Sequence, residues 1–100
     1  MEECKKKFEL GWVVVTRGVR GEMERNHLFR SFVQKCISRH ISGDWGDLDP
    51  EDFNLNDKAL ATGGDKLFSV YKSSRIPEGR IWIITEWDRS ATTILFPSEY

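Results

Sequence analysis

Apolar residues between Leu28 and His40 recur every three or four positions, which is the spacing of one face of an α-helix. The stripe consists of Leu28, Phe29, Phe32, Val33, Cys36, Ile37 and His40. The residues between them are polar or charged, so the helix has one apolar face that must be buried against another element. The pattern predicts a helix over residues 27–40, with Asn26 as its N-cap.

The last third of the chain supplies candidate strands for this helix to cover. Residues 66–73, 80–87 and 91–96 are rich in β-branched and aromatic side chains, and turn residues separate them. Residues 8–16 form another β-rich run whose centre is apolar on both faces, which favours a strand covered on both sides or at a crowded position. We therefore expect an antiparallel sheet of about four strands, made from one N-terminal strand and a C-terminal three-stranded meander.

A second main helix is predicted from Asp49 onward. Asp49 is a suitable N-cap, Pro50 fits the first helical position, and Glu51 and Asp52 lie over the positive end of the helix dipole. The helix should run to about residue 62, where Gly63 and Gly64 provide a left-handed exit. With a short helical turn near 19–25, the expected fold is α+β, with two main helices packed on the sheet.

One hundred residues form a single domain, 1–100, with residues 1–7 expected to be frayed. The composition, 39% hydrophobic and 31% charged, is that of an ordinary globular domain. Cys36 lies on the helical stripe and is expected to be a buried thiol rather than a partner of Cys4. The chain has no secretory segment and no long apolar run, so we expect a cytoplasmic protein without a membrane span.

The formal net charge is only −1, but the charges are unevenly distributed. Residues 1–40 contain nine Lys or Arg against five Asp or Glu, whereas residues 41–65 contain one Lys against seven acids. The last 35 residues are nearly balanced, with five basic and four acidic side chains. The sequence thus predicts a polarised molecule with one acidic face, and its near-neutral total argues against direct nucleic-acid binding.

Residues 40–52 combine two glycines, a tryptophan and five acids between the two predicted helices. Asp44, Asp47 and Asp52 could be solvated acids at a helix entrance or a docking surface for a basic partner. A hard cation held by Asp44, Asp47 and Asp49 is a further alternative, but the spacing does not match the twelve-residue calcium loop. Trp45 either folds over the core between the helices or, if exposed, anchors an interface.

A second polar motif occupies the predicted turn before the last strand. Glu86, Asp88 and Arg89 could form a general acid–base pair with an arginine that holds an anion. In the alternative reading they build a hairpin turn, in which Asp88 accepts hydrogen bonds from Ser90 and Arg89 pairs with Glu86. His40 is expected to be structural. We expect the 43–47 loop and the 86–90 turn to approach one another, with Arg89 reaching an acid of the loop.

Three segments carry a resemblance to a known family: His40–Asp52, Asn56–Gly64 and Ile81–Tyr100. The specific parts are Gly-Asp-Trp-Gly-Asp-Leu in the first and Thr-Glu-x-Asp-Arg-Ser-Ala-Thr-Thr in the third. Together they resemble small bacterial proteins called plasmid-related, which occur on plasmids, prophages and other mobile genetic elements. The resemblance covers most of residues 10–100, although the family more often has a small residue at the position of Trp87. It implies a place among accessory genes that include inhibitors of host defence.

The function these features favour is that of a small non-enzymatic binding protein of a mobile genetic element. Its acidic surface would occupy a basic host protein, for example a nucleic-acid-targeting defence enzyme, in the manner of anti-CRISPR or anti-restriction proteins. The alternative is a small enzyme with a cleft built from Glu86, Asp88, Arg89, His40 and Asp44. No metal or cofactor is expected. The predicted partner-binding residues are Asp44, Trp45, Asp47, Asp52, Glu86, Asp88 and Arg89.

Overall fold

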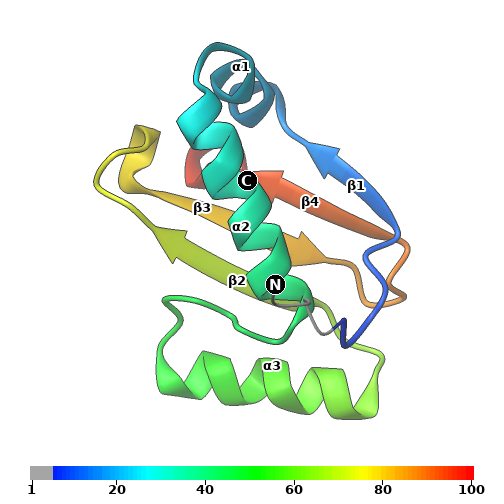
Figure 1. Ribbon diagram of the computed structural model, residues 1–100. Helices are drawn as coiled ribbons and strands as arrows, with labels where there is room; N and C mark the ends of the chain where they lie inside the picture. Colours follow the sequence, from blue (N-terminus) through cyan, green and yellow to red (C-terminus); the bar gives the residue numbers. More distant parts are fainter. Residues whose placement is uncertain (1–5) are drawn as a thin grey trace.

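The structure is a computed structural model that describes residues 6–100, so Cys4 and most of the expected frayed segment lie outside it. Three helices and a four-stranded sheet confirm the α+β class, and the strand order is β1-β4-β3-β2 (Figure 1). Short 3₁₀ turns at Pro77–Gly79 and Pro97–Glu99 complete the chain. The elements are β1 (Trp12–Val15), α1 (Arg17–Arg25), α2 (His27–Ile41), α3 (Pro50–Thr62), β2 (Leu67–Lys72), β3 (Arg80–Thr85) and β4 (Ala91–Leu95).

The sheet is mixed, so the expectation of an entirely antiparallel sheet is partly wrong. The meander β2–β3–β4 is antiparallel as predicted, but β1 pairs with β4 in parallel, with Trp12 opposite Ala91 and Val15 opposite Ile94. Hairpins fix the directions of the last three strands. Three helices separate β1 from the meander, and no turn chemistry in the sequence sets the direction of a strand joined in that way.

Helix α2 crosses one face of the sheet and forms the main core with it (Figure 1). Phe29, Val33 and Cys36 are buried against the sheet, whereas Leu28, at the start of the predicted stripe, is 69% exposed. The Asn26 side chain accepts hydrogen bonds from the Leu28 and Phe29 amides, which confirms it as the N-cap. The Cys36 thiol is free, and burial raises its pKa to about 12, so it behaves as a small hydrophobic group.

Strand β1 lies at the edge of the sheet and is not covered on both sides, contrary to the sequence expectation. Trp12 is 81% exposed, and Val13 and Val14 are about half exposed. An apolar run on both faces of a strand is typical of a covered position. Here it marks an edge strand that leaves Trp12, Val13 and Val14 largely in solvent, whereas Val15 packs against the main core.

Helix α3 lies beside β2 and closes a second, smaller core (Figure 1). Trp45, Ala59 and Leu67 are buried there, and partly buried side chains from the N-terminal segment, the α2–α3 loop and α3 pack around them. Asp49 accepts a hydrogen bond from the Asp52 amide, and Gly63 has φ +72°, so the predicted cap and exit of this helix are confirmed. None of the helices in residues 6–100 is long and apolar enough to cross a membrane.

Candidate functional site

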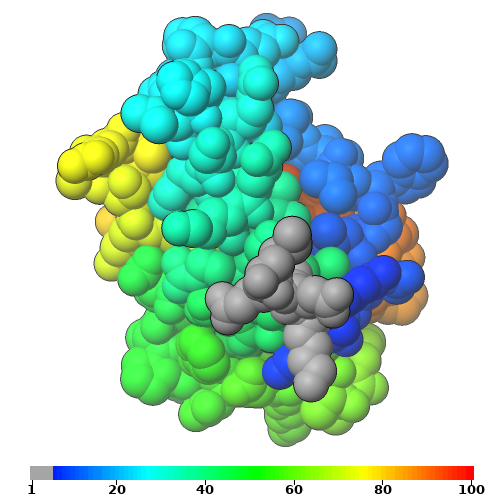
Figure 2. All heavy atoms as spheres, viewed as in Figure 1, coloured from blue at the N-terminus to red at the C-terminus, as the bar shows by residue number. Residues whose placement is uncertain are grey.

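The acidic segment forms one end of the molecule. In Figure 2 the α2–α3 loop and α3, in green, occupy the lower end, whereas α1 and the start of α2, in light blue and cyan, occupy the opposite end. All seven acids of residues 41–65 are exposed residues, with Lys58 as the one basic residue among them. The charge asymmetry of the sequence is therefore also an asymmetry in space, and we call residues 42–65 the acidic end.

The first half of the acidic end covers the outer edge of β2. Gly46 forms a parallel bridge with Val70, and the Val70 amide donates to the Trp45 carbonyl at 3.2 Å. Gly46 has φ +77°, and a Cβ there would lie 2.1 Å from the Val70 oxygen, so only glycine fits. The Asp47 amide bonds the Val70 carbonyl, and its carboxylate accepts from the Lys72 amide at 2.9 Å. Asp47 is thus both a surface acid and a structural edge cap.

Asn56 on α3 completes this edge. Its side-chain amide donates to the Phe68 carbonyl and accepts from the Phe68 amide, as a neighbouring strand would. Together the loop and α3 satisfy the outward-facing groups of β2, which prevents this edge from pairing with other chains.

Trp45 belongs to the core and does not offer its ring to a partner. It is fully buried, lies 5.5 Å from the His40 ring and stacks on Phe8 at 6.1 Å between ring centroids. The indole N–H donates to the Asp57 carboxylate at 2.9 Å, so the ring ties the loop to α3. Of the two roles considered for this tryptophan, the structure has the packing role.

Asp44 is exposed but is held by an internal ion pair. The Arg39 guanidinium donates to both of its oxygens, at 2.7 and 3.2 Å, and this bond holds the Asp44 pKa below its usual range. Arg39 also lies over the Tyr71 ring, 4.8 Å from the centroid. A partner that uses Asp44 must share it with Arg39.

The outward face of α3 carries acids whose carboxylates have no such internal partner. Glu51 and Asp52 lie in its first turn and are exposed, and no side-chain bond of either is found among residues 6–100. Leu55, one turn further along, is 61% exposed. Sequence reasoning missed Leu55. Its only signal is that it falls outside the stripe of Phe53, Asn56, Ala59 and Leu60.

The second polar motif is a structural turn. The Ser90 amide donates to Asp88 at 3.0 Å, and hydrogen bonding to Ser90 lowers the Asp88 pKa. Arg89 has φ +60°, and its guanidinium donates to carbonyl oxygens of the turn and of the α3 end, including Asp65 at 2.6 Å and Ala59 at 3.3 Å. It bonds the Glu86 carbonyl and not its carboxylate, in contrast to the expected pairing. Arg89 therefore joins the β3–β4 turn to α3.

The two polar motifs do not meet, so the expected approach between them is wrong. The 43–47 loop bonds the Val70–Lys72 half of β2, whereas the turn follows Thr85, which pairs with Leu67 at the other end of that strand. In Figure 1 the α2–α3 loop extends to the left and the β3–β4 turn lies at the right. The sequence does not show which end of β2 the 43–47 loop and the 86–90 turn each reach, and the two motifs contact opposite ends. None of the main hollows of residues 6–100 is lined by Asp44, Glu86 or Asp88.

His40 is the centre of a buried chain of hydrogen bonds. Its Nδ1 lies 2.6 Å from the Ser69 hydroxyl and its Nε2 lies 2.9 Å from the Thr85 hydroxyl, which in turn lies 2.8 Å from that of Thr92. Thr92 donates to the Leu10 carbonyl at 2.7 Å, and a carbonyl can only accept. Because each hydroxyl has one proton, the direction of the whole chain follows. Thr85 donates to Thr92, Nε2–H donates to Thr85, and Ser69 donates to Nδ1.

The hydrogen-bonded row of His40, Ser69, Thr85 and Thr92 is unsuited to catalysis, although it contains a serine and a histidine. His40, Ser69, Thr85 and Thr92 are all fully buried, so no substrate can reach the serine oxygen. Burial, together with the positive charge of Arg89, lowers the His40 pKa to about 3, so the ring is neutral at physiological pH. The enzyme alternative thus loses its histidine as well as its shared cleft.

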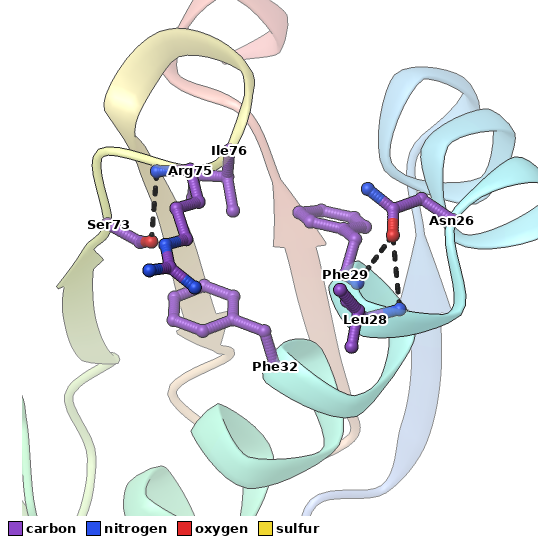
Figure 3. Close-up of a pocket in the computed structure, with 7 residues that line it drawn as sticks. All are labelled: Asn26, Leu28, Phe29, Phe32, Ser73, Arg75 and Ile76. Carbon is purple, nitrogen blue, oxygen red and sulfur yellow. Dashed lines mark hydrogen bonds between the residues drawn. The ribbon is translucent and has the colours of Figure 1, made fainter.

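None of the main hollows of residues 6–100 is lined by a predicted partner-binding residue, although one of them, at the end of α3, is lined by Ala59 and Asp65, to which Arg89 donates. Figure 3 shows one of about 250 Å³ between the start of α2 and the β2–β3 connection, where Arg75 points toward Phe32. Another, of about 300 Å³, lies on the sheet face opposite α2 between Phe68, Trp82 and Tyr100. Residues 6–100 contain no group of three or more His, Cys, Asp or Glu side chains placed to hold a metal ion.

Comparison with known proteins found no relative of this protein. No protein-family model, curated protein or solved structure matches the chain.

Proposed function

We propose that this protein is a small non-enzymatic binding protein that acts by docking its acidic end on a basic surface of a protein partner. The observation that carries the proposal is the gathering of the acids of residues 41–65 at one end, on an exposed helix whose outward face combines Glu51 and Asp52 with the exposed Leu55. Aligned acids steer a basic partner, and an apolar side chain among them supplies contact area once water is expelled.

The partner class follows from this charge pattern and from the resemblance to plasmid-related proteins. A protein that binds nucleic acid presents a basic surface for phosphates, and clustered carboxylates can occupy it. A nucleic-acid-targeting host defence protein is therefore the candidate partner. Glu86, Asp88 and Arg89 contribute only if the partner also reaches the β3–β4 turn, which Arg89 joins to the C-terminal end of α3.

The test is an affinity pull-down from a bacterial host, with variants that separate docking from folding. Asp44 and Asp47 have internal partners, so the informative change is Glu51→Gln with Asp52→Asn, which removes two charges that have no side-chain bonds in the described structure. Glu9→Gln with Glu24→Gln removes the same charge from exposed residues elsewhere and is the matched control.

We expect the wild type and the control to recover a nuclease or helicase that the α3 variant loses, with circular dichroism showing both variants folded. Association of the purified pair should slow as salt rises, because screening shortens the reach of exposed charges to about 8 Å at physiological ionic strength. Equal recovery by both variants, with rates indifferent to salt, would falsify docking through the acidic end.

A further inference from the structure

The two edges of the sheet are treated in opposite ways. The outward groups of β2 are bonded by the α2–α3 loop and by Asn56, as described above. The Trp12 amide donates to the Ser90 carbonyl just before β4, at 3.0 Å, and the Thr16 amide donates to Ile94 of β4, at 3.1 Å. The two-residue repeat of a strand therefore turns the N–H and C=O groups of Val13 and Val15 outward. Within residues 6–100 no hydrogen bond reaches these outward groups. The β1 edge is open.

The side chains of β1 also lack the usual protection of an open edge. Natural edges are blocked by lysine, proline, bulges or a covering element. The Trp-Val-Val-Val strand has none of these, and Trp12, Val13 and Val14 are among the most exposed large apolar residues of the molecule. Figures 1 and 2 place this segment at the right-hand border, with no described element beyond it.

We propose that β1 is the interface of a homodimer, in which the β1 strands of two copies pair antiparallel about a two-fold axis at Val14. In this register Val13 of one copy lies opposite Val15 of the other, and each such pair exchanges two backbone hydrogen bonds. These are the residues whose groups point outward. The strand is thus complementary to itself, as an isologous interface requires, and the two sheets become one sheet of eight strands.

The side chains follow the same symmetry. Val13 and Val15 lie on the α2 face, because they pair with Thr92 and Ile94, whose side chains are buried beneath α2. Trp12 and Val14 lie on the other face, so Val14 meets its own copy across the axis. On the α2 side, Val13 also borders a shallow hollow of about 380 Å³ lined by the N-terminal segment and Ile41.

The available area sets the strength of the dimer. An aromatic side chain offers about 150–250 Å², so Trp12 with the two exposed valines provides roughly 300 Å² of apolar surface per copy, or roughly 600 Å² in a pair. Backbone and flanking residues bring this toward the roughly 1,000 Å² at which specific interfaces begin. An interface of this size is typical of weak, transient association, so the dimer should be reversible.

Analytical ultracentrifugation of the full chain from low micromolar to near-millimolar concentration tests the proposal. We expect the mean mass to rise from one copy to two. Val14→Lys alone and Val14→Glu alone should each stay monomeric, since like charges would meet on the axis, whereas an equimolar mixture of the two should dimerise. Leu28→Lys, which changes an exposed apolar residue away from β1, is the control and should dimerise like the wild type.

Hydrogen exchange supplies a readout that needs no variant. The Val13 and Val15 amides should gain protection as concentration rises, while the Val14 amide, which bonds β4, should not change. A wild type that stays monomeric throughout, a mixture that fails to pair, or Val13 and Val15 amides indifferent to concentration would each overturn the proposal. Salt separates it from the acidic-end proposal: the chain beside β1 is weakly basic, with Lys6, Lys7 and Arg17 against Glu9, so salt should not weaken this dimer.

Discussion

His40 is the residue whose chemistry the fold changes most. Its ring is fully buried, and both nitrogens have hydroxyl partners that are themselves committed, so no water is needed to satisfy them. A buried polar group costs little only when all of its hydrogen bonds are made. The Ser69–His40–Thr85–Thr92 chain meets that condition and fixes α2 on the sheet.

The lowered pKa of His40 predicts a pH dependence of stability. The unfolded ring binds a proton near pH 6.5 and the folded ring only near pH 3, so the free energy of unfolding is fully retained above pH 6.5. It should fall below that by up to about 1.4 kcal/mol per pH unit. Urea unfolding between about pH 7 and about pH 5 should show this slope in the wild type.

His40→Gln should be less stable at neutral pH but should have a shallower slope, because its side chain takes up no proton on unfolding. His27→Gln removes an exposed imidazole and is the matched control, with the wild-type slope expected. Identical slopes for wild type and His40→Gln would contradict the assignment of a neutral, buried ring.

Whether the role of a residue could be predicted depends on how far along the sequence its contacts lie. Asn26, Asp49 and Gly63 could be assigned from the sequence because capping depends on a residue and its next few neighbours. Asp47 and Trp45 could not, because the β2 edge that they cover is separated from them by α3. The acids of residues 40–52 were recognisable as a group, but only the structure separates those with internal partners from those without.

Among the elements, α2 was the most predictable and β1 the least. The three- and four-residue period of α2 is a property of one segment, and the structure follows it. The direction and exposure of β1 depend instead on a strand nearly eighty residues away. An apolar run can be buried by the fold or left at an edge, and the sequence of the run is the same in both cases.

The packing of α2 predicts unequal effects along its apolar stripe. Phe29 is 2% exposed and stacks on Phe96, so Phe29→Ala should lower the free energy of unfolding by about 3–5 kcal/mol. Phe32 is only partly buried at the border of the core, so Phe32→Ala should cost clearly less. Chemical denaturation of the two variants makes the comparison, and equal losses would show that the border of the core is misplaced.

At the scale of the whole molecule, two apolar clusters share one sheet. The larger joins α1 and α2 to β2, β3 and β4, and the smaller joins Trp45, Ala59 and Leu67 beside α3. Because α3 is held by the smaller cluster and by the edge contacts of β2, it should open more readily than α2 does. The acidic end would then be the least stable part of the fold.

Native-state hydrogen exchange of Trp45→Phe tests this division. The change removes the bond to Asp57 and part of the small cluster, so the amides of α3 should exchange faster relative to those of α2 and β3. The free energy of opening should fall by about 1–3 kcal/mol in α3, from the lost bond and packing, with a smaller fall elsewhere. Uniform acceleration across all elements would mean that α3 opens only by global unfolding.

The pairing of β1 with β4 has a consequence for the order in which the fold is assembled. Trp12 and Ala91 are 79 positions apart, so β1 has no neighbour until the ribosome has made β4, whereas α1 and α2 can form from adjacent residues. During synthesis the Trp-Val-Val-Val segment therefore waits longest for its hydrogen bonds, with both of its edges unpaired. Exposed strands of this kind are where nascent chains associate wrongly, and a chaperone that binds short apolar segments would find its site there.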